Sequence, residues 1–438
     1  MGHDADGLIR LRRTTAALLL SGVVLLAGFG CDALGSSVAE SSLRPGPETA
    51  AEAPPGALAP EALANATYPS MMFEGALVKL TDGRFHEPGR GITITLLSEP
   101  VGHGVIDGVP VAAVLLAESG GGSGTFVSLA LVGQVAGQAV GLATASLGDR
   151  PRVKHVAIGE DGTVTVQMVQ VGARDAFCCP ATPMSVDYVY ADGRLAPRRV
   201  SSATIDVEGY ASQANAFILQ PTPYDRSEPP GGQGEPGHFA WTFGTDMELD
   251  LARAQVSGTG YVAVYPVSPY RAIWEAAGDP FVADTLEALE GLLAKRPAES
   301  RAPLPGLPLR NAVNDFAAQV AYLDLPEGGR GMRFVGRFAQ DAAPLRNDQL
   351  RYVFQGLSAD GSWLVIASLP ISTTALPQDN EVAVVDPGAP HRDITVHLEQ
   401  WRRTFNDLQA ADFEPSLDVL DRLLRSVTVS TTDLIESR

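Results

Sequence analysis

The sequence has 438 residues, of which 32 are basic and 51 acidic, and its formal net charge is −19 at pH 7. So acidic a surface disfavours nucleic acid as a partner, because it repels phosphate backbones. Three cysteines are too few for a disulfide framework, and the length is enough for two domains.

The first 31 residues have the pattern of an export signal. Arg10, Arg12 and Arg13 precede an apolar run from Ala16 to Gly30, which ends at Cys31. The run fits the core of a secretory signal peptide and is shorter than the roughly 20 residues of a membrane span. Its end resembles the lipobox of bacterial lipoproteins, which implies that Cys31 is acylated, for example with palmitate, and becomes the first mature residue.

This resemblance predicts a protein held by lipid on Cys31 at the extracytoplasmic face of the cell membrane. Phe29 departs from the lipobox pattern, which has a small residue at that place. Two alternatives therefore stay open. One is ordinary cleavage, which would release a soluble product, and the other is an uncleaved membrane anchor.

Residues 32–62 have the composition of a linker. They are rich in Ala, Pro, Ser and Glu and hold few large apolar side chains. Such a segment buries too little apolar surface to offset its ordering entropy. We expect a disordered tether between the lipid and the folded part of the chain.

Residues 63–200 predict a mainly antiparallel β domain. Turn pairs such as Asp82-Gly83 and Asp161-Gly162 separate short β-branched runs. Two runs, Val109 to Ala117 and Phe126 to Val132, are continuously apolar, as expected for central strands covered on both faces. Further strands are predicted over residues 76–80, 84–86, 92–96 and 164–171.

Residues 201–255 predict a loop-rich crossing, with strands over 217–219 and 238–243. An α+β domain is predicted over 256–430 and a short tail over 431–438. Asp279-Pro280 precedes apolar residues spaced for one helix face, from Val282 to Leu293. Two more helices are indicated by the apolar spacing over 394–408 and 417–424. Strands are predicted over 261–265, 319–325, 332–338, 350–357 and 362–369, so the fold class is mixed.

Several motifs resemble uncharacterised bacterial lipoproteins. In the β domain they include GGGSGTF, from Gly120 to Phe126, and FCCP, from Phe177 to Pro180. In the α+β domain the stretch from Tyr352 to Gly361 carries the likeness. The ending, Leu417 to Val429, is similar to the closing helix and strand of PsbP/Mog1-like folds, which implies a binding or assembly scaffold.

Glycines 120–124 favour a tight inter-strand turn over a phosphate-binding loop. A phosphate loop ends in Gly-Lys-Ser/Thr and leads into a helix, whereas a strand is predicted after Gly124. Ser123 lacks the closing glycine of a nucleophile elbow, because Thr125 stands at that place.

The sequence predicts neither catalytic residues nor a bound metal or cofactor. The histidines we considered lack the spacing of metal ligands, and His391 and His397 are six residues apart, on roughly opposite sides of a helix. The other histidines that we considered are His86, His103 and His155, which are scattered through the β domain. Asp107 with nearby carbonyl groups does not supply the six or more oxygen ligands of a calcium site.

The adjacent cysteines Cys178 and Cys179 allow three interpretations. In the first interpretation they form a vicinal disulfide, which would be strained because their α-carbons are closer than usual for a disulfide. Alternatively they are two unpaired thiols, or a redox or soft-metal site. We favour the disulfide, since export makes oxidation plausible.

These features together predict a non-catalytic envelope lipoprotein that binds a small ligand or another envelope protein. Two alternatives come from other classes. One is an exported hydrolase whose site is assembled from residues distant in sequence, and the other is a thiol redox or copper-handling protein that uses Cys178 and Cys179.

Overall fold

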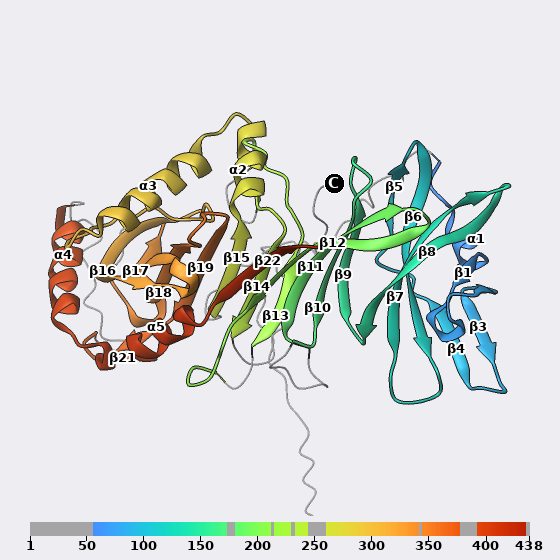
Figure 1. Ribbon diagram of the computed structural model, residues 1–438. Helices are drawn as coiled ribbons and strands as arrows, with labels where there is room; N and C mark the ends of the chain where they lie inside the picture. The colour runs from blue at the N-terminus through green and yellow to red at the C-terminus, as the bar shows by residue number, and fades with distance from the viewer. Residues whose placement is uncertain are drawn as a thin grey trace, which may run out of the picture. The chain divides into compact units, whose positions relative to one another are not determined.

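The computed structural model describes residues 56–172, 180–211, 214–228, 233–243, 260–340, 344–376 and 392–434. Contacts group Ala53–Arg438 into one compact unit, separate from Met1–Glu52. The fold is mostly β, and an N-terminal β region is followed by an α+β region (Figure 1). The predicted fold class is therefore confirmed.

The N-terminal region begins with an eight-stranded, mainly antiparallel sheet. Its strands lie in the order β2-β1-β8-β7-β6-β4-β3, and β5 pairs with β6. They are β1 (Thr67–Pro69), β2 (Leu77–Lys79), β3 (Arg84–Glu87), β4 (Ile92–Leu96), β5 (Gly102–Ile106), β6 (Val109–Ser119), β7 (Phe126–Val135) and β8 (Gln138–Asp149). Residues Val111 to Leu116 are all buried, so β6 is covered on both faces, as its continuous apolar run predicts.

A five-stranded sheet packs against this one. Its order is β22-β12-β11-β10-β9. The strands are β9 (Arg152–Ile158), β10 (Val164–Gln170), β11 (Thr182–Ala191), β12 (Arg194–Thr204) and β22 (Thr428–Asp433). Leu115, Leu129 and Val166 are part of the shared apolar core. Gly104 of β5 permits close approach, since a β-carbon there would lie 2.6 Å from the β-carbon of Ile158.

The α+β region is built on a seven-stranded antiparallel sheet. Its order is β13-β14-β15-β19-β18-β17-β16. The strands are β13 (Asn215–Leu219), β14 (His238–Phe243), β15 (Gly260–Pro266), β16 (Val313–Asp324), β17 (Arg330–Ala339), β18 (Arg351–Leu357) and β19 (Trp363–Pro370). A small separate pair is formed by β20 (Ser372–Thr373) and β21 (Phe413–Glu414).

Helices cover both faces of the seven-stranded sheet. Leu286 and Leu289 of α3 pack with Tyr270 of α2 on one face, and Phe405 of α4 packs with Leu420 of α5 on the other (Figure 1). The α-helices are α1 (Pro60–Ala64), α2 (Val267–Ala276), α3 (Phe281–Lys295), α4 (Arg392–Asp407) and α5 (Leu417–Arg425). The 3₁₀ turns are η1 (Met71–Phe73), η3 (Pro326–Gly328), η4 (Asn347–Gln349) and η5 (Ala410–Asp412).

Several elements differ from the sequence-based expectation. Helix α2 was not predicted. Its Pro269 lies in the first turn, where proline is tolerated. Strands β5, β8, β9, β11 and β12 were also not predicted. Residues assigned to the tether belong to the fold, since Leu58 is buried and α1 begins at Pro60.

The C-terminal strand β22 joins the five-stranded sheet. It pairs antiparallel with β12, from Thr428 opposite Thr204 to Asp433 opposite Arg199. Side-chain hydroxyl groups meet across the pair, with 3.0 Å between Ser202 Oγ and Ser430 Oγ. Residues 431–433, which the sequence analysis assigned to a tail, thus lie in a strand. Their exposed hydroxyl residues carry no apolar period that would indicate it.

A buried ion pair attaches α5 to the seven-stranded sheet. Arg333 Nε lies 3.3 Å from Asp421 Oδ1, and the Tyr352 hydroxyl donates to the same oxygen at 2.7 Å. Burial raises the pKa of Tyr352 well above its ordinary value, so the hydroxyl stays a donor.

We expect Asp421→Ala to lower the free energy of unfolding by about 3–5 kcal/mol, because Arg333 would stay buried without its counter-charge. Tyr352→Phe removes only one hydrogen bond and should cost about 1 kcal/mol. Urea unfolding followed by circular dichroism measures both. Equal losses for the two variants would contradict this role of the ion pair.

Candidate functional site

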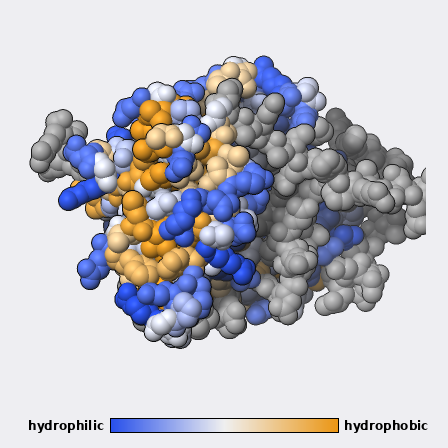
Figure 2. Space-filling model, turned by 90° about the vertical axis from the view of Figure 1, so that its right-hand side faces the viewer, coloured by the Kyte–Doolittle hydropathy of each residue, from blue (hydrophilic) through white to orange (hydrophobic). Residues whose placement is uncertain are grey.

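The candidate site is an apolar surface on the outer face of the eight-stranded sheet, the face turned away from the five-stranded sheet. We call it the outer patch, and it consists of Met71, Met72, Phe73, Phe85 and Phe126. Met71 is 40% exposed and Phe126 is 37% exposed. Figure 2 shows the side of the molecule that bears α1 and strands β1, β3 and β4, and apolar side chains gather there.

Aromatic and cationic contacts organise the patch. The rings of Phe73 and Phe85 meet edge to face, with 5.7 Å between their centroids. The Arg90 guanidinium lies 5.4 Å from the Phe73 centroid, within the range of a cation–π contact. Met71 Sδ lies 3.5 Å from Ser128 Oγ, which places η1 against β7. Arg90 also pairs with a carboxylate, with 4.0 Å between its Nη1 and Glu87 Oε2. The patch therefore combines adaptable thioethers with rigid rings and has an ion pair at its edge.

A fully buried carboxyl group holds the patch from beneath. Glu118 of β6 is 0% exposed, and its oxygens accept hydrogen bonds from Ser70 Oγ at 2.5 Å and Ser128 Oγ at 2.9 Å. The backbone N–H of Met72 also points to this group, at 3.4 Å. Over the ranges that the structure covers, no basic side chain forms an ion pair with Glu118. Neutral donors therefore satisfy it.

Local backbone chemistry explains why η1 forms. Ser70 caps the turn, because its hydroxyl accepts from the backbone N–H of Met72 at 3.2 Å. The chain then reverses through Glu74 and Gly75, with φ of 53° and 85°. The N–H of Gly75 returns to the Ser70 carbonyl at 2.8 Å. The turn thus directs Met71 outward while Ser70 reaches the buried carboxyl group.

We expect Glu118→Ala to expose the η1 amides to exchange and to cost about 1–3 kcal/mol for each buried donor left without a partner. Hydrogen exchange at Met72, with urea unfolding, measures both effects. Glu61→Ala, at an exposed carboxylate of α1, is the control and should stay within about 0.5 kcal/mol of the parent. Unchanged exchange at Met72 would contradict the role assigned to Glu118.

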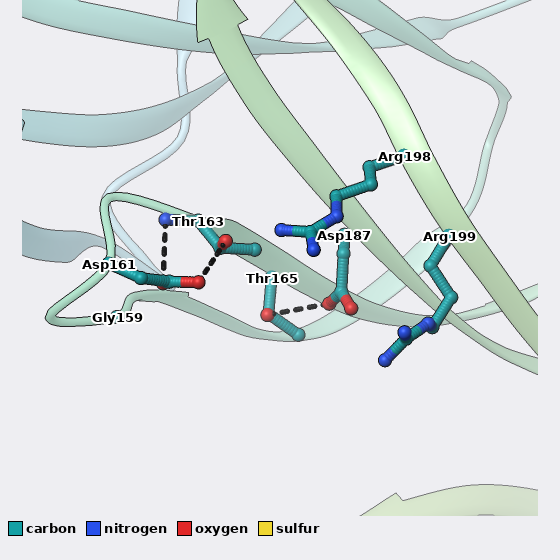
Figure 3. Close-up of a pocket in the computed structure, with 7 residues that line it drawn as sticks. All are labelled: Gly159, Asp161, Thr163, Thr165, Asp187, Arg198 and Arg199. Atoms are coloured by element: carbon teal, nitrogen blue, oxygen red, sulfur yellow. Dashed lines mark hydrogen bonds between the residues drawn. The ribbon is translucent and has the colours of Figure 1, made fainter. Parts of the chain in front are cut away.

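A polar hollow of about 300 Å³ lies on the opposite side of the five-stranded sheet from its core (Figure 3). The hollow is lined by Gly159, Asp161, Thr163, Thr165, Asp187, Arg198 and Arg199. Arg198 is the extra residue of a bulge in β12, so its side chain projects on the same side as that of Arg199.

Most charged groups of this hollow are engaged within the chain. Asp187 accepts from Thr165 Oγ1 at 2.8 Å, and Arg199 pairs with Asp433 at 2.8 Å. Hydrogen bonds from Thr163 lower the pKa of Asp161 below its ordinary value. These contacts stabilise the turn and strand edges, and the hollow is lined by side chains of both charges.

A second polar cluster is buried beneath the segment that leads into β14. The Tyr265 hydroxyl donates to Glu235 Oε2 at 2.9 Å, and His238 Nδ1 donates to the Pro236 carbonyl at 2.9 Å. The His238 ring stacks on Tyr265 with 3.9 Å between centroids. Nearby, Trp274 Nε1 donates to the Gly234 carbonyl at 2.6 Å. This cluster joins β14 and β15 to α2.

Burial shifts the ionisation of both acid–base groups in this cluster. It lowers the pKa of His238 from 6.5 to about 4, and it raises the pKa of Glu235 above its usual 4.5. The His238 imidazole is therefore neutral at pH 7. Because the unfolded chain binds this proton more readily, His238 costs stability as the pH falls from about 6.5 to about 4.

Between pH 7 and pH 4, protonation of His238 should lower the free energy of unfolding of the parent by about 3 kcal/mol, at about 1.36 kcal/mol per pKa unit. We expect His238→Gln to remove this part of the loss. Glu235 contributes with the opposite sign, because it favours folding below its raised pKa, and its Oε2 lies 3.8 Å from His238 Nε2. A comparison of Glu235→Gln with the Glu235→Gln, His238→Gln double variant therefore isolates the imidazole. Urea unfolding at several pH values measures the slope, and His86→Gln at an exposed histidine is the control. Parallel profiles for parent and His238→Gln would be inconsistent with a neutral buried imidazole.

The structure separates the residues that the sequence analysis considered. His86 lies in β3, His103 in β5 and His155 in β9. Residues 120–124 connect β6 and β7, as the predicted inter-strand turn requires. Asp107 lies in the turn between β5 and β6, at a φ of 51°. Among the residues that the structure describes, no group of three His, Cys, Asp or Glu side chains is placed to bind a metal.

The predicted lipidation and disulfide residues lie outside the described residues. They are Cys31, Cys178 and Cys179, and His391 is likewise not described. Lipid on Cys31 and the vicinal disulfide thus stay predictions. Within the described ranges, no helix is both long enough and apolar enough to cross a bilayer.

No family model, no curated protein and no solved structure matches this chain. The resemblance to uncharacterised lipoproteins and to PsbP/Mog1-like folds stays a prediction from sequence motifs.

Sequence reasoning did not identify the outer patch. The one local signal was the run Met71-Met72-Phe73, three large apolar residues placed between Ser70 and Glu74 with no strand alternation. No local signal marks Glu118, because it comes at the end of an apolar strand run and its partner Ser70 lies 48 residues away.

Proposed function

We propose that this chain is an exported envelope protein, held by lipid on Cys31, that binds an extracytoplasmic partner through the outer patch without catalysis of its own. The observation that carries the proposal is the partly exposed Met71 and Phe126 surface, fixed from beneath by Glu118. Partly exposed apolar side chains over such a buried support are candidates for contact with a partner.

The N-terminal sequence supports the proposed export and membrane anchoring. Arginines, a short apolar core and Cys31 follow one another as in lipoprotein signals, and a linker-like segment separates them from the compact unit. A tethered body with a preformed contact surface fits a binding role outside the cytoplasmic membrane.

We expect the mature protein to begin at Cys31 with an acyl mass, and to sediment with membranes. In Cys31→Ser the acyl mass should be lost, because the modified thiol is absent, and the protein should leave the membrane fraction or keep its signal. Intact-protein mass spectrometry and alkaline fractionation measure this, with Cys178→Ser as a control that stays acylated. Wild-type protein that retains Met1, carries no acyl group and is cytosolic would refute the proposed address.

An exported hydrolase is the second candidate, and the Glu235 cluster is the observation that favours it. Carboxyl and imidazole groups with shifted pKa values gather at functional sites more often than elsewhere. Ester and glycoside turnover that Glu235→Gln abolishes, while the fold is retained, would support this candidate over the binding role.

A further inference from the structure

We propose that the polar hollow of the five-stranded sheet is a binding site for a small zwitterion, and that free α-amino acids are the class of ligand it takes. The hollow lies on the side of this sheet that is turned away from its core (Figure 3). The outer patch belongs to the eight-stranded sheet. The inference therefore goes beyond the proposed binding role and does not depend on it.

A β-bulge in β12 places two guanidinium groups at the hollow. Asp187 of β11 lies opposite Arg199, and the next pair is Tyr188 with Pro197, so Arg198 is the extra residue between the two pairs. In a regular strand, consecutive side chains point to opposite faces, and one of the two arginines would enter the apolar core. The bulge places both on the solvent side (Figure 3). Bulges often re-aim a side chain in this way next to functional sites.

Two carboxylates line the same hollow, and threonines hold both in place. Asp187 Oδ1 accepts from Thr165 Oγ1 at 2.8 Å. Asp161, in the loop between β9 and β10, accepts from the backbone N–H of Thr163 at 3.0 Å and from its hydroxyl at 2.8 Å. These bonds orient the carboxylates in advance, so little side-chain freedom is lost when a ligand binds.

The positive charge of Arg198 has no counter-charge in contact with it. Over the ranges that the structure describes, no carboxylate oxygen lies within 4.0 Å of its guanidinium group, although Asp161 and Asp187 line the same hollow. Arg199 differs, since its Nε lies 2.8 Å from Asp433 Oδ1. A guanidinium group donates in a planar fork that matches a carboxylate. Arg198 can therefore bind the carboxylate of a ligand with two hydrogen bonds.

The charges of the hollow favour a ligand that carries both signs. Two arginines and two aspartates share about 300 Å³, so a simple anion would meet the aspartates and a simple cation the arginines. A zwitterion avoids both conflicts, with its carboxylate at Arg198 and its ammonium group at Asp187. The Oδ2 atom of Asp187 is available for this contact, because it has no hydrogen-bond partner among the described residues. The lining holds no aromatic or large apolar side chain, which disfavours an apolar ligand.

The test titrates the full chain with glycine, acetate and methylammonium, which carry both charges, only the negative charge and only the positive charge. Saturation-transfer NMR, observed on the carbon-bound protons of each ligand, measures binding. We expect saturable binding of glycine with a dissociation constant of about 1 mM, as a few charge-assisted hydrogen bonds at an exposed site allow. Acetate and methylammonium should each bind at least about tenfold more weakly, because each meets one like charge.

Two variants remove one charge of each sign. Arg198→Gln should weaken glycine binding at least about tenfold and strengthen methylammonium binding, and Asp187→Asn should weaken glycine binding and strengthen acetate binding. The new asparagine keeps an oxygen that accepts from Thr165, and urea unfolding checks that both variants are folded. Arg194→Gln, at an exposed arginine of β12 outside the hollow, is the matched control and should leave glycine binding unchanged.

Three outcomes would overturn the inference. Equal affinities for glycine and acetate would reduce the hollow to a contact of any anion with exposed arginines. Undiminished glycine binding in Arg198→Gln would place the binding elsewhere on the protein. No saturable transfer to glycine up to about 100 mM would show that the hollow takes no amino acid. Each of these results leaves the proposed lipid at Cys31 and the outer patch untouched.

Discussion

The fully buried carboxyl group of Glu118 is the constraint on which the outer patch depends. A carboxyl group without solvent is tolerated only where donors meet it. Ser70 and Ser128 supply hydroxyl groups, and the N–H of Met72 supplies a third donor. Because these donors must stay in place, η1 is held against β6 and β7, and its apolar side chains are left at the surface.

Similar polar connections fix other elements on the large apolar sheets. Asp421 joins α5 to Arg333 and Tyr352, and Glu235 joins the approach to β14 to Tyr265. Apolar burial drives these layers together but does not specify their register. Buried polar groups that lose their partners raise the free energy of the folded state, so a buried polar pair favours the one arrangement in which both groups meet.

The sequence by itself determined the elements whose signal is local. The apolar spacing of Val282 to Leu293 identified α3, and continuous apolar runs identified β6 and β7 as central strands. The predicted export address also rests on the sequence alone. Tertiary structure decided the rest, because pairing partners are distant: β22 joins β12 more than 200 residues away, and Ser70 meets Glu118 across 48 residues. Strands such as β8, rich in Ala and Gly, have weak intrinsic preference and become strands only because their neighbours supply the hydrogen bonds and the buried face.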